Sequence, residues 1–438
     1  MNLKNILDGI EGLKAKGELD LEIEGIESNS KKIEKGFLFV AIKGFTVDGH
    51  EFIGSAIENG AVAVVVDESC DLKALKIPSN ITLIVAKDTR EFLALASANF
   101  YGNPSERFKL IGITGTKGKT TTTFMIKEIL EKAGKKVGLI GTIATYINGR
   151  KIADSDRTTP ESLELQRMFA DMVKEGVEYV VMEVSSQSLK LHRVDGCHFD
   201  ITGYGIDNFG NFLAKDITIT NSYVDFKAKI ADRNERVKVD IPGRFTVYNA
   251  LCAICVCRKI GIESSVMKEA LEKIKVPGRS EMVENKLEIP IMIDYAHSPE
   301  SLQNILQAVK SYTRGRVISV FGCGGDRDSR KRPVMGEISG KIADYTIITS
   351  DNPRTENPEA IVSEIEEGIK KTKGKYEVVV DRVEAITKAI QMANKTDIIV
   401  LAGKGHEPYQ EINGVKHPFD ERIIVNDIIS KINKKGKN

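Results

Sequence analysis

The sequence predicts an α/β protein of about three domains, because its 438 residues are too many for one ordinary core. Short apolar runs alternate with stretches of helical periodicity, a pattern typical of largely parallel, doubly wound sheets. The composition is that of a globular protein, with 41% hydrophobic and 29% charged residues, so burial can offset the entropy of folding. We expect domains at residues 1–104, 105–277 and 278–438, which meet at loop-forming stretches.

The first expected domain alternates short strands with a helix. The apolar runs FLFVAI, AVAVVVDE and NITLIVA predict strands, and HEFIGSAIENG predicts a helix between the first two. Residues 101–105 combine glycine, asparagine and proline and precede a new strand. They therefore predict the loop that closes a small α/β domain.

The second expected domain begins with a strand, a glycine-rich loop and a helix. KLIGIT is the strand, and Ile126, Ile129 and Leu130 then recur at helical spacing until Gly134, where a helix would stop. A helix over residues 163–173 and the strand EYVVMEV follow. This order predicts a mostly parallel sheet.

The third expected domain shows the clearest alternation of strands and helices. Its apolar strands are IPIMIDYA, RVISVFG, YTIITS and DIIVLAG. Ser298 before Pro299 and Asn357 before Pro358 are typical helix starts, with a capping residue and proline in the first turn. We therefore expect a doubly wound carboxy-terminal domain.

The charge balance argues against bulk attraction to nucleic acid or to an anionic membrane. The chain has 63 basic and 62 acidic side chains, so any anion must be held by a local site. The first residues, MNLKNILDGIEGL, carry charges and lack a signal-peptide core. No run approaches the ~18 apolar residues of a membrane helix. We expect a cytoplasmic monomer with no nucleic-acid or membrane partner.

Cys252, Cys255 and Cys257 form a C-x-x-C-x-C cluster that could suggest a metal site. No second cysteine pair completes such a site, and the surrounding run NALCAICVCRKIG is apolar. Free cysteine usually behaves as a small core residue. We expect a buried helix that ends near Gly261.

The most informative local motif is GTKGKTT at residues 115–121, between a predicted strand and a predicted helix. Glycines let backbone N–H groups close around phosphates, and a helix N-terminus adds positive charge. Lys119 can reach the β- and γ-phosphates of a nucleotide, and the Thr120 hydroxyl can bind Mg²⁺. Five residues separate Gly112 from Gly118, so the spacing is not that of a strict Walker A loop. A plain glycine turn before a helix is the alternative.

Glu183 lies near the carboxyl end of the strand YVVMEV. In a parallel sheet this end meets the phosphate loop, which is where a Mg²⁺ ligand is expected. The alternative is a solvated carboxylate with no role.

A longer series of motifs runs in the order found in a known family. The motifs are GTKGKTT at residue 115, RTTP at 157, MEVSSQSLKLHR at 182, GR at 278, DYAH at 294, FGCGGDRD at 321, DNPR at 351 and GKGHE at 403. With them the chain resembles the Mur ligases, in particular the branch that adds the third residue of the stem peptide. A chance match to one motif is plausible, but a chance match to the ordered series is not.

The resemblance implies an ATP-dependent, amide-forming ligase of three α/β domains, with a P-loop in the central one. In this family a precursor carboxylate attacks the γ-phosphate of ATP to give an acyl phosphate, and an amine then displaces phosphate. The implied ligands are ATP, Mg²⁺, UDP-N-acetylmuramoyl-L-alanyl-D-glutamate and meso-diaminopimelate, in peptidoglycan precursor synthesis. This chemistry needs no protein nucleophile, so catalysis rests on positioning and charge neutralisation.

The resemblance also implies roles for individual residues. For ATP these are Gly115, Thr116, Lys117, Gly118, Lys119, Thr120, Thr121, Asn249, Arg279 and Asp294, with Lys119, Glu183 and His297 as the catalytic set and Thr120 and Glu183 as metal ligands. For the UDP precursor they are Ser28, Ser30, Thr158, Thr159, Ser185 and Arg193. For the incoming amino acid they are Arg327, Asp351, Asn352, Pro353, Arg354, Gly403 and Glu407.

The chemistry of these side chains agrees with the implied roles. Arg327 or Arg354 can bind a carboxylate through two parallel hydrogen bonds, and Glu407 can form an ion pair with an ammonium group. The DNPR form is associated with meso-diaminopimelate, whose second carboxylate needs a cation. The alternatives are that Arg354 is an ordinary surface arginine and that Asp294 caps a helix.

The resemblance fails between Asp200 and Gly243, as if several dozen residues were absent after Asp200. The family has there a lysine that becomes carbamoylated and supports a Mg²⁺ ion. Lys227 and Lys229 are poor substitutes, because YVDFKAKI alternates apolar and polar residues like a half-exposed strand.

Three alternatives to a diaminopimelate-adding ligase stay open at this point. A lysine-adding ligase of the same family is the nearest, and folylpolyglutamate synthase is a more distant relative with a similar ATP loop. The third is a binding protein without turnover, which the missing central segment would explain.

Overall fold

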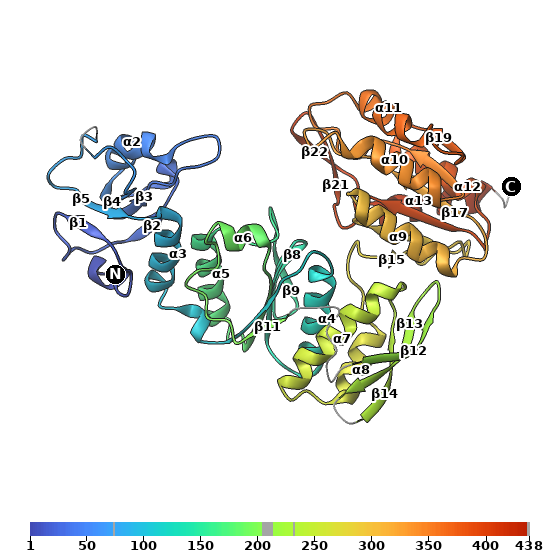
Figure 1. Ribbon diagram of the computed structural model, residues 1–438, viewed down its shortest axis with the longest axis horizontal. Coiled ribbons are helices and arrows are strands. Elements are labelled where there is room, and N and C mark those ends of the chain that lie inside the picture. The colour runs from blue at the N-terminus through green and yellow to red at the C-terminus, as the bar shows by residue number, and fades with distance from the viewer. Residues whose placement is uncertain (73–74, 204–212, 231–232, 436–438) are drawn as a thin grey trace. The chain divides into compact units, whose positions relative to one another are not determined.

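The computed structural model describes residues 1–72, 75–203, 213–230 and 233–435 (Figure 1). The chain divides into two compact units, Met1–Gly205 and Ile206–Asn438. This division falls inside the expected second domain. The expected domain limits at residues 104 and 277 therefore stay predictions.

The first unit opens with a five-stranded sheet in the order β1-β5-β4-β3-β2, in which only β1 is antiparallel. The strands are β1 (Lys14–Lys16), β2 (Gly25–Glu27), β3 (Phe37–Val40), β4 (Ala61–Asp67) and β5 (Thr82–Ala86). The helices are α1 (Leu3–Leu7), α2 (Ile53–Glu58) and α3 (Thr89–Phe100). Alternate residues of β4 pack to opposite faces, Ala63 and Val65 with α1 and α3, and Val64 and Val66 with α2. The strands and the helix predicted for residues 1–104 are confirmed.

The second sheet of this unit has the order β11-β6-β10-β7-β8-β9. Its first four strands are parallel and its last two antiparallel, so the sheet is mixed. Its strands are β6 (Lys109–Ile113), β7 (Val137–Ile140), β8 (Ala144–Ile147), β9 (Arg150–Asp154), β10 (Tyr179–Glu183) and β11 (Ile201–Gly203). The helices are α4 (Lys119–Lys132), α5 (Ser162–Lys174) and α6 (Ser186–Lys190). The parallel arrangement brings the carboxyl ends of β6, β7 and β10 to one edge.

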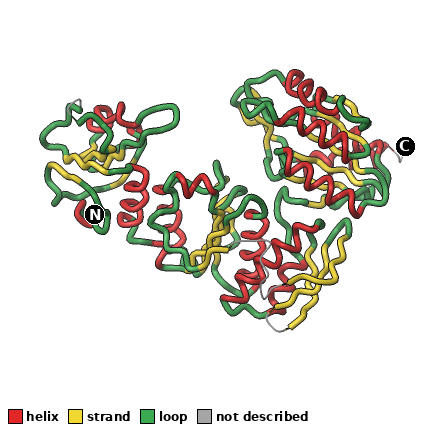
Figure 2. Tube along the Cα trace, viewed as in Figure 1, coloured by secondary structure: helices red, strands yellow, loops and turns green. Residues whose placement is uncertain are grey.

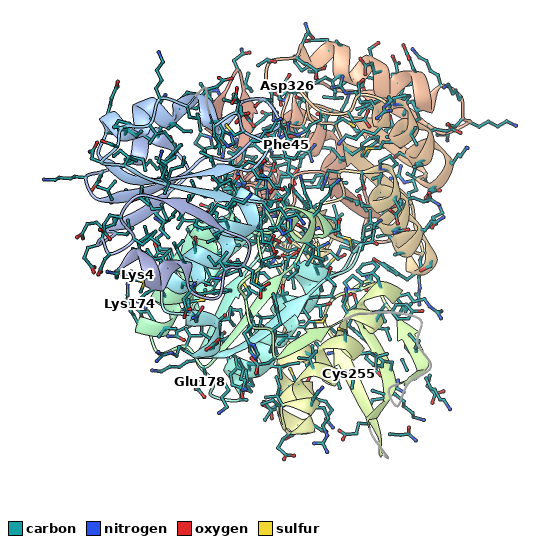
Figure 3. The ribbon with its side chains drawn as sticks, turned by 60° about the vertical axis from the view of Figure 1, so that its left-hand side comes forward. Lys4, Phe45, Lys174, Glu178, Cys255 and Asp326 are labelled. Atoms are coloured by element: carbon teal, nitrogen blue, oxygen red, sulfur yellow. The ribbon has the colours of Figure 1, made fainter. Side chains whose placement is uncertain are left out.

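The second unit begins with an antiparallel sheet of three strands, β12 (Leu213–Ile219), β13 (Val224–Ile230) and β14 (Arg233–Val239). Helices α7 (Arg244–Lys259) and α8 (Ser264–Glu272) pack against this sheet (Figure 2). In β13 Val224, Phe226 and Ala228 are buried while Lys227 is exposed, which confirms the predicted half-exposed strand. The predicted cysteine helix is confirmed as α7, on which Cys255 lies (Figure 3).

The third large sheet has the order β15-β16-β20-β17-β18-β19, parallel except for β15. Its strands are β15 (Glu281–Met282), β16 (Ile291–Asp294), β17 (Val317–Phe321), β18 (Tyr345–Ile348), β19 (Tyr376–Val378) and β20 (Ile398–Ala402), and a hairpin of β21 (Tyr409–Ile412) and β22 (Val415–Pro418) follows. The helices are α9 (Pro299–Tyr312), α10 (Lys331–Ile342), α11 (Pro358–Ile369), α12 (Arg382–Met392) and α13 (Glu421–Lys435).

This third sheet has a hydrophobic core on each face. In β20, Ile398, Val400 and Ala402 pack in the core that contains α9, α10 and α11, whereas Ile399 and Leu401 pack in the core that contains α12 and α13. Figure 1 shows these helices around the strands. The doubly wound carboxy-terminal fold is therefore confirmed.

The predicted helix starts are confirmed in this sheet. Ser298 caps α9 in a reciprocal arrangement with Ser301, and Asn357 caps α11 through the N–H groups of its first turn. Asp294 instead accepts a hydrogen bond from the N–H of Ser280 at 2.8 Å. The alternative that Asp294 caps a helix is wrong, because Ser298 already fills that position.

None of the helices within the described ranges is long and apolar enough to cross a membrane.

Helices α10 and α11 pack against each other through glycines. A Cβ atom at Gly368 would overlap the backbone carbonyl of Pro333, and one at Gly336 would overlap that of Ile365. Backbone atoms cannot move aside as the end of a flexible side chain can. The contact therefore depends on the absence of side chains at both positions.

We predict that Gly368→Ala lowers the free energy of unfolding by about 1–3 kcal/mol, because the new methyl group forces the two helices apart. Gly54→Ala in α2 is the control, since a Cβ atom there meets nothing within 4 Å. Alanine at that helical site should leave stability unchanged or raise it by up to ~1 kcal/mol. Calorimetric unfolding of the full chain measures both, and equal effects would contradict the packing argument.

Candidate functional site

The glycine-rich loop joins β6 to α4 with two left-handed glycines. Gly115 has φ of +140° and Gly118, which immediately precedes α4, has φ of +79°. Residues with a Cβ atom rarely adopt such φ values, so both positions favour glycine. Nζ of Lys119 donates to the carbonyl oxygen of Gly115 at 2.8 Å. The lysine thus folds back over the loop at the start of the helix, where the N-terminal dipole already favours an anion.

Glu183, at the end of β10, is buried beside this loop with an exposed fraction of 1%. Oε2 accepts the hydroxyl of Thr120 at 3.0 Å and that of Thr142 at 3.2 Å. Oε1 accepts the backbone N–H of Thr142 at 2.8 Å. A Cβ atom at Gly141 would overlap Oε1, so any larger residue there would displace the carboxylate from its present position. The alternative of a solvated Glu183 is wrong.

Thr142 is a residue of this site that the sequence prediction missed. It follows β7, whose carboxyl end lies at the same edge as those of β6 and β10. Its hydroxyl also lies 3.1 Å from that of Thr158. The pair Gly141-Thr142 directly after an apolar strand was the available signal.

The residues expected to contact the precursor continue this network. Oγ1 of Thr159 donates to the carbonyl oxygen of Glu183 at 2.9 Å and accepts the N–H of Ser185 at 3.1 Å. Arg193 donates to the carbonyl oxygen of Thr159 at 3.2 Å and pairs with Glu161 at 2.8 Å. The structure therefore joins these predicted residues, but Arg193 already has an internal carboxylate partner.

Ser28 and Ser30 lie after β2 of the five-stranded sheet. Ser28 is half-buried, whereas Ser30 is buried in a 3₁₀ turn, where its carbonyl oxygen accepts the side-chain amide of Asn59 at 2.9 Å. The burial of Ser30 limits what its hydroxyl can contact, so of the two Ser28 is the more accessible.

A second cluster lies at the carboxyl ends of β18 and β20, in the other compact unit. Nδ2 of Asn352 donates to Oε2 of Glu407 at 2.8 Å. Nζ of Lys404 donates to Oδ1 of Asn352 at 2.9 Å and to Oε2 of Glu407 at 3.2 Å. A Cβ atom at Gly403 would overlap Oδ2 of Asp351. The structure thus brings together four of the predicted amino-acid-binding residues around a buried lysine that was not predicted.

Arg354 is held at the margin of this cluster. Its Nε donates to Oε2 of Glu411 at 3.1 Å and its NH1 group to the carbonyl oxygen of Gly325 at 2.7 Å. The side chain is 19% exposed, so the alternative of an ordinary surface arginine is wrong. A Cβ atom at Gly324 would lie 2.8 Å from the NH1 nitrogen and 3.9 Å from Cγ of Arg327. Both predicted arginines therefore flank one glycine.

Burial and charge act in opposite directions on the two carboxyl groups of the cluster. Burial raises the pKa of Glu407 above its usual value, even though Lys404 opposes the shift. At Asp351 burial also favours the neutral form, but Lys404 and Arg382, together with the backbone N–H of Asn352 and the nearby His297, hold the pKa below its usual value. Asp351 is therefore the more firmly ionised of the two.

Arg279 and His297, to which the resemblance assigns roles at the nucleotide, lie beside Tyr295, as does His406, which was not predicted. The guanidinium group of Arg279 lies 4.8 Å from the ring centroid of Tyr295, and the rings of His297 and His406 lie 4.5 and 4.9 Å from it. Asn249 is on α7 and is buried.

The oxygens of Thr120 and Glu183 are of the hard type that Mg²⁺ takes, and their burial within hydrogen-bonding distance fits a shared cation. Over the described ranges, no group of three or more His, Cys, Asp or Glu side chains could hold a metal ion. Phosphate and water oxygens would therefore complete the shell. Lys227 is exposed and pairs with Asp216 at 2.7 Å, which does not resemble a metal-supporting lysine. The Lys229 side chain lies outside the described residues.

Three family models match the chain in succession: Mur ligase family, catalytic domain, over residues 22–101, Mur ligase middle domain over 113–202, and Mur ligase, glutamate ligase domain, over 278–405. The UDP-N-acetylmuramoyl-L-alanyl-D-glutamate--2,6-diaminopimelate ligase of Caldanaerobacter subterraneus subsp. tengcongensis is 44% identical, over 99% of this chain and 100% of the relative. The chain belongs to the Mur ligase family. The ligase of the same name from Clostridioides difficile is 41% identical to this Mur ligase, over 99% and 100% of the two chains.

Solved structures agree with this assignment of the Mur ligase fold. A structure of UDP-N-acetylmuramoyl-L-alanyl-D-glutamate--2,6-diaminopimelate ligase matches with a TM-score of 0.68 and 26% identity, over 99% of each chain. A folylpolyglutamate synthase from Mycobacterium tuberculosis matches with a TM-score of 0.57 and 14% identity, over 72% of this chain and 92% of its own. The latter shows a shared fold alone. The predicted three-domain α/β architecture is confirmed.

The lengths bear on the expected shortening of this Mur ligase. The alignment with the Caldanaerobacter ligase spans 489 positions, whereas this chain has 438 residues, so at least 51 positions of the relative have no counterpart here. The middle-domain match ends at residue 202. Both facts support a missing segment, and its position after Asp200 stays a prediction.

His192, beside Arg193, supplies a pH-dependent contact. Its Nδ1 lies 2.6 Å from Oδ2 of Asp195, and its Nε2 lies 3.8 Å from Oδ2 of Asp88. The hydrogen bond with Asp195 raises the pKa of His192 above its usual value, and the charge of Asp88 acts in the same direction.

We predict that His192 titrates above the ~6.5 of an unperturbed histidine. Because the folded-state pKa is raised, the contact stabilises the fold fully below that ordinary value and is lost as pH rises through the folded pKa. Histidine ring NMR over pH 5–9 measures the titration, with Asp195→Asn expected to lower the pKa of His192 alone. If Asp195→Asn does not change the pKa of His192, the assigned contact is contradicted.

Proposed function

We propose that this Mur ligase joins meso-diaminopimelate to UDP-N-acetylmuramoyl-L-alanyl-D-glutamate at the expense of ATP, through an acyl phosphate, in peptidoglycan precursor synthesis. Support comes from the relatives of that name, which the chain matches over nearly its full length. The structural observation that carries the proposal is Arg354, partly exposed beside the Glu411 carboxylate and next to the cluster of Asn352 and Glu407, at the edge of a parallel sheet. This arrangement suits an amino acid end that bears both a carboxylate and an ammonium group.

At the nucleotide end, the backbone N–H groups of residues 115–121 cradle the phosphates of ATP. Lys119 turns from the carbonyl oxygen of Gly115 to the β- and γ-phosphates and neutralises charge as the γ-phosphoryl group moves to the precursor carboxylate. Thr120 and Glu183 hold Mg²⁺, which when bound supplies further positive charge to the phosphates. Thr142 keeps the Glu183 carboxylate oriented through two hydrogen bonds.

At the amino acid end, Arg354 binds the carboxylate of the distal stereocentre. Its Nε and NH1 groups are occupied by Glu411 and Gly325, which orient the guanidinium group and leave NH2 for the substrate. Glu407, Asp351 and Asn352 receive the neighbouring ammonium group. Arg327, Pro353 and Gly403 shape the same site.

The remaining predicted contacts are part of the proposal. ATP is contacted by Thr116, Lys117, Gly118, Thr121, Asn249, Arg279 and Asp294. The catalytic set includes His297, which acts at the reacting phosphate. Ser28, Ser30, Thr158, Thr159, Ser185 and Arg193 contact the precursor. The acting species is a monomer.

A second candidate is a protein that binds these ligands without turning them over. The observation that favours it is the absence of at least 51 aligned positions relative to the Caldanaerobacter ligase. If the lost positions include a metal-supporting lysine, less positive charge faces the γ-phosphate in the transition state.

We predict that the purified chain forms the UDP-muramoyl-tripeptide from ATP, Mg²⁺ and UDP-muramoyl-dipeptide with diaminopimelate, and far less with lysine. Mass spectrometry of the product measures both reactions. Product with lysine alone would move the assignment to a lysine-adding ligase. No product with either, from a folded chain that binds ATP, would favour the second candidate.

We predict that Arg354→Met raises the KM for diaminopimelate by roughly tenfold to a hundredfold, because a charge-assisted bond to the carboxylate is lost. Steady-state kinetics with ATP and precursor saturating give the value. Arg330→Met is the matched control, since Arg330 is 89% exposed and, among the residues that the structure describes, forms an ion pair with the nearby Asp328 alone. The same KM in both variants would show that Arg354 does not bind the substrate.

A further inference from the structure

Lys404 is fully buried inside the carboxylate cluster, and the proposed function gives it no role. Its side chain is 0% exposed. Nζ lies 5.6 and 5.8 Å from the ring centroids of Tyr409 and Phe419, in addition to its bonds with Asn352 and Glu407. Burying an ammonium group is unfavourable unless it is paired, and apolar residues of similar volume often stabilise a core at least as well. Core packing alone therefore does not account for this lysine.

Lys404 fixes the orientation of the Asn352 amide. Oδ1 of Asn352 accepts from Nζ of Lys404 at 2.9 Å and from the backbone N–H of Glu411 at 3.0 Å. An ammonium group and a backbone N–H are donors only, so the amide oxygen must face both of them. The amide nitrogen then points to Oε2 of Glu407, as observed at 2.8 Å.

This arrangement occupies one oxygen of Glu407 and leaves the other for a ligand. Oε2 receives both Asn352 and Lys404. In the part of the chain that the structure describes, Oε1 accepts no hydrogen bond, and the Glu407 side chain is 15% exposed. Oε1 is thus the accessible acceptor of the cluster.

The charges of the cluster also select a ligand. Asp351 and Glu407 contribute two negative charges when ionised, and Lys404 balances one of them. The cluster then carries one net negative charge, and Glu411 connects it to Arg354, because its N–H donates to Asn352 and its carboxylate pairs with the guanidinium group. A carbon that carries one ammonium and one carboxylate complements this pattern, whereas an amine without a carboxylate does not.

We propose that Lys404 is a positioning residue that sets selectivity for the zwitterionic end of the diamino acid. It holds Asn352 and Oε2 of Glu407 so that Oε1 faces the substrate ammonium group, and it removes one of two negative charges that would otherwise attract any amine. The inference rests on the proposed function and extends it to a residue that does not touch the substrate.

The test compares Lys404→Met with the unaltered chain in steady-state kinetics. Methionine has a similar length but no charge and no donor. The KM for diaminopimelate should rise by roughly tenfold or more, because Asn352 and Glu407 lose their fixed orientation. The KM values for ATP and precursor should not change. The preference for diaminopimelate over lysine, as a ratio of kcat/KM, should fall.

Two further variants separate positioning from general stability. Arg316→Met removes a cation that pairs with the buried Asp397 at 2.7 Å, at the amino ends of the same sheet. It should lower the melting temperature without changing the KM for diaminopimelate. Lys404→Gln keeps a donor for Asn352 without the charge, so its KM should lie between those of the unaltered chain and Lys404→Met. If Lys404→Met does not fold, the glutamine variant decides.

A folded Lys404 variant with unchanged KM and unchanged preference would overturn the inference while leaving the proposed function intact. If the unaltered chain shows no turnover, calorimetric titration of diaminopimelate in the presence of nucleotide and precursor measures its binding affinity instead. Binding without turnover would refute the proposed catalysis, and the affinities of the variants would then replace KM in the comparison. Neither binding nor turnover by the unaltered chain would overturn both proposals.

Discussion

The buried carboxylate of Glu183 is the interaction on which the glycine-rich loop of this molecule depends. An ionised carboxylate removed from water must be satisfied by donors. Here they come from two other segments, the Thr120 hydroxyl at the start of α4 and the Thr142 hydroxyl and N–H after β7. The carboxylate therefore ties the glycine-rich loop to the strand edge, and a Cβ atom at Gly141 would push against its Oε1.

The carboxy-terminal cluster also consists of a buried ion that surrounding groups must satisfy, but here the ion is positively charged. Lys404 is the buried ion, and Asn352, Glu407 and two aromatic rings surround it. Arg382 and Glu421 form a buried ion pair at 2.8 Å, and Arg382 also donates to the carbonyl oxygens of Ser350 and Ala402. Charge-assisted hydrogen bonds of this kind hold the Asn352 amide and one oxygen of Glu407 in a single orientation.

Parallel topology explains why both clusters form at strand ends. Parallel strands collect their carboxyl ends at one edge of a sheet, and the loops beyond that edge can carry polar groups without disturbing the core. Neither cluster lies on the five-stranded sheet or on the antiparallel β12–β14 sheet. In the latter, β13 has a buried apolar face, and Lys227 lies on its exposed face.

The sequence by itself determined the strands and helices that flank the site, the helix caps at Ser298 and Asn357, and the family. These follow from local periodicity, capping chemistry and ordered motifs, which need no knowledge of distant contacts. Only the tertiary structure decided that Thr142 serves Glu183, that Glu411 orients Arg354 and that Lys404 lies buried among the carboxylates. Their partners are 41, 57 and 52 residues away in the chain. No local pattern encodes such pairings, because they arise only when parallel strands bring separate loops to the same edge.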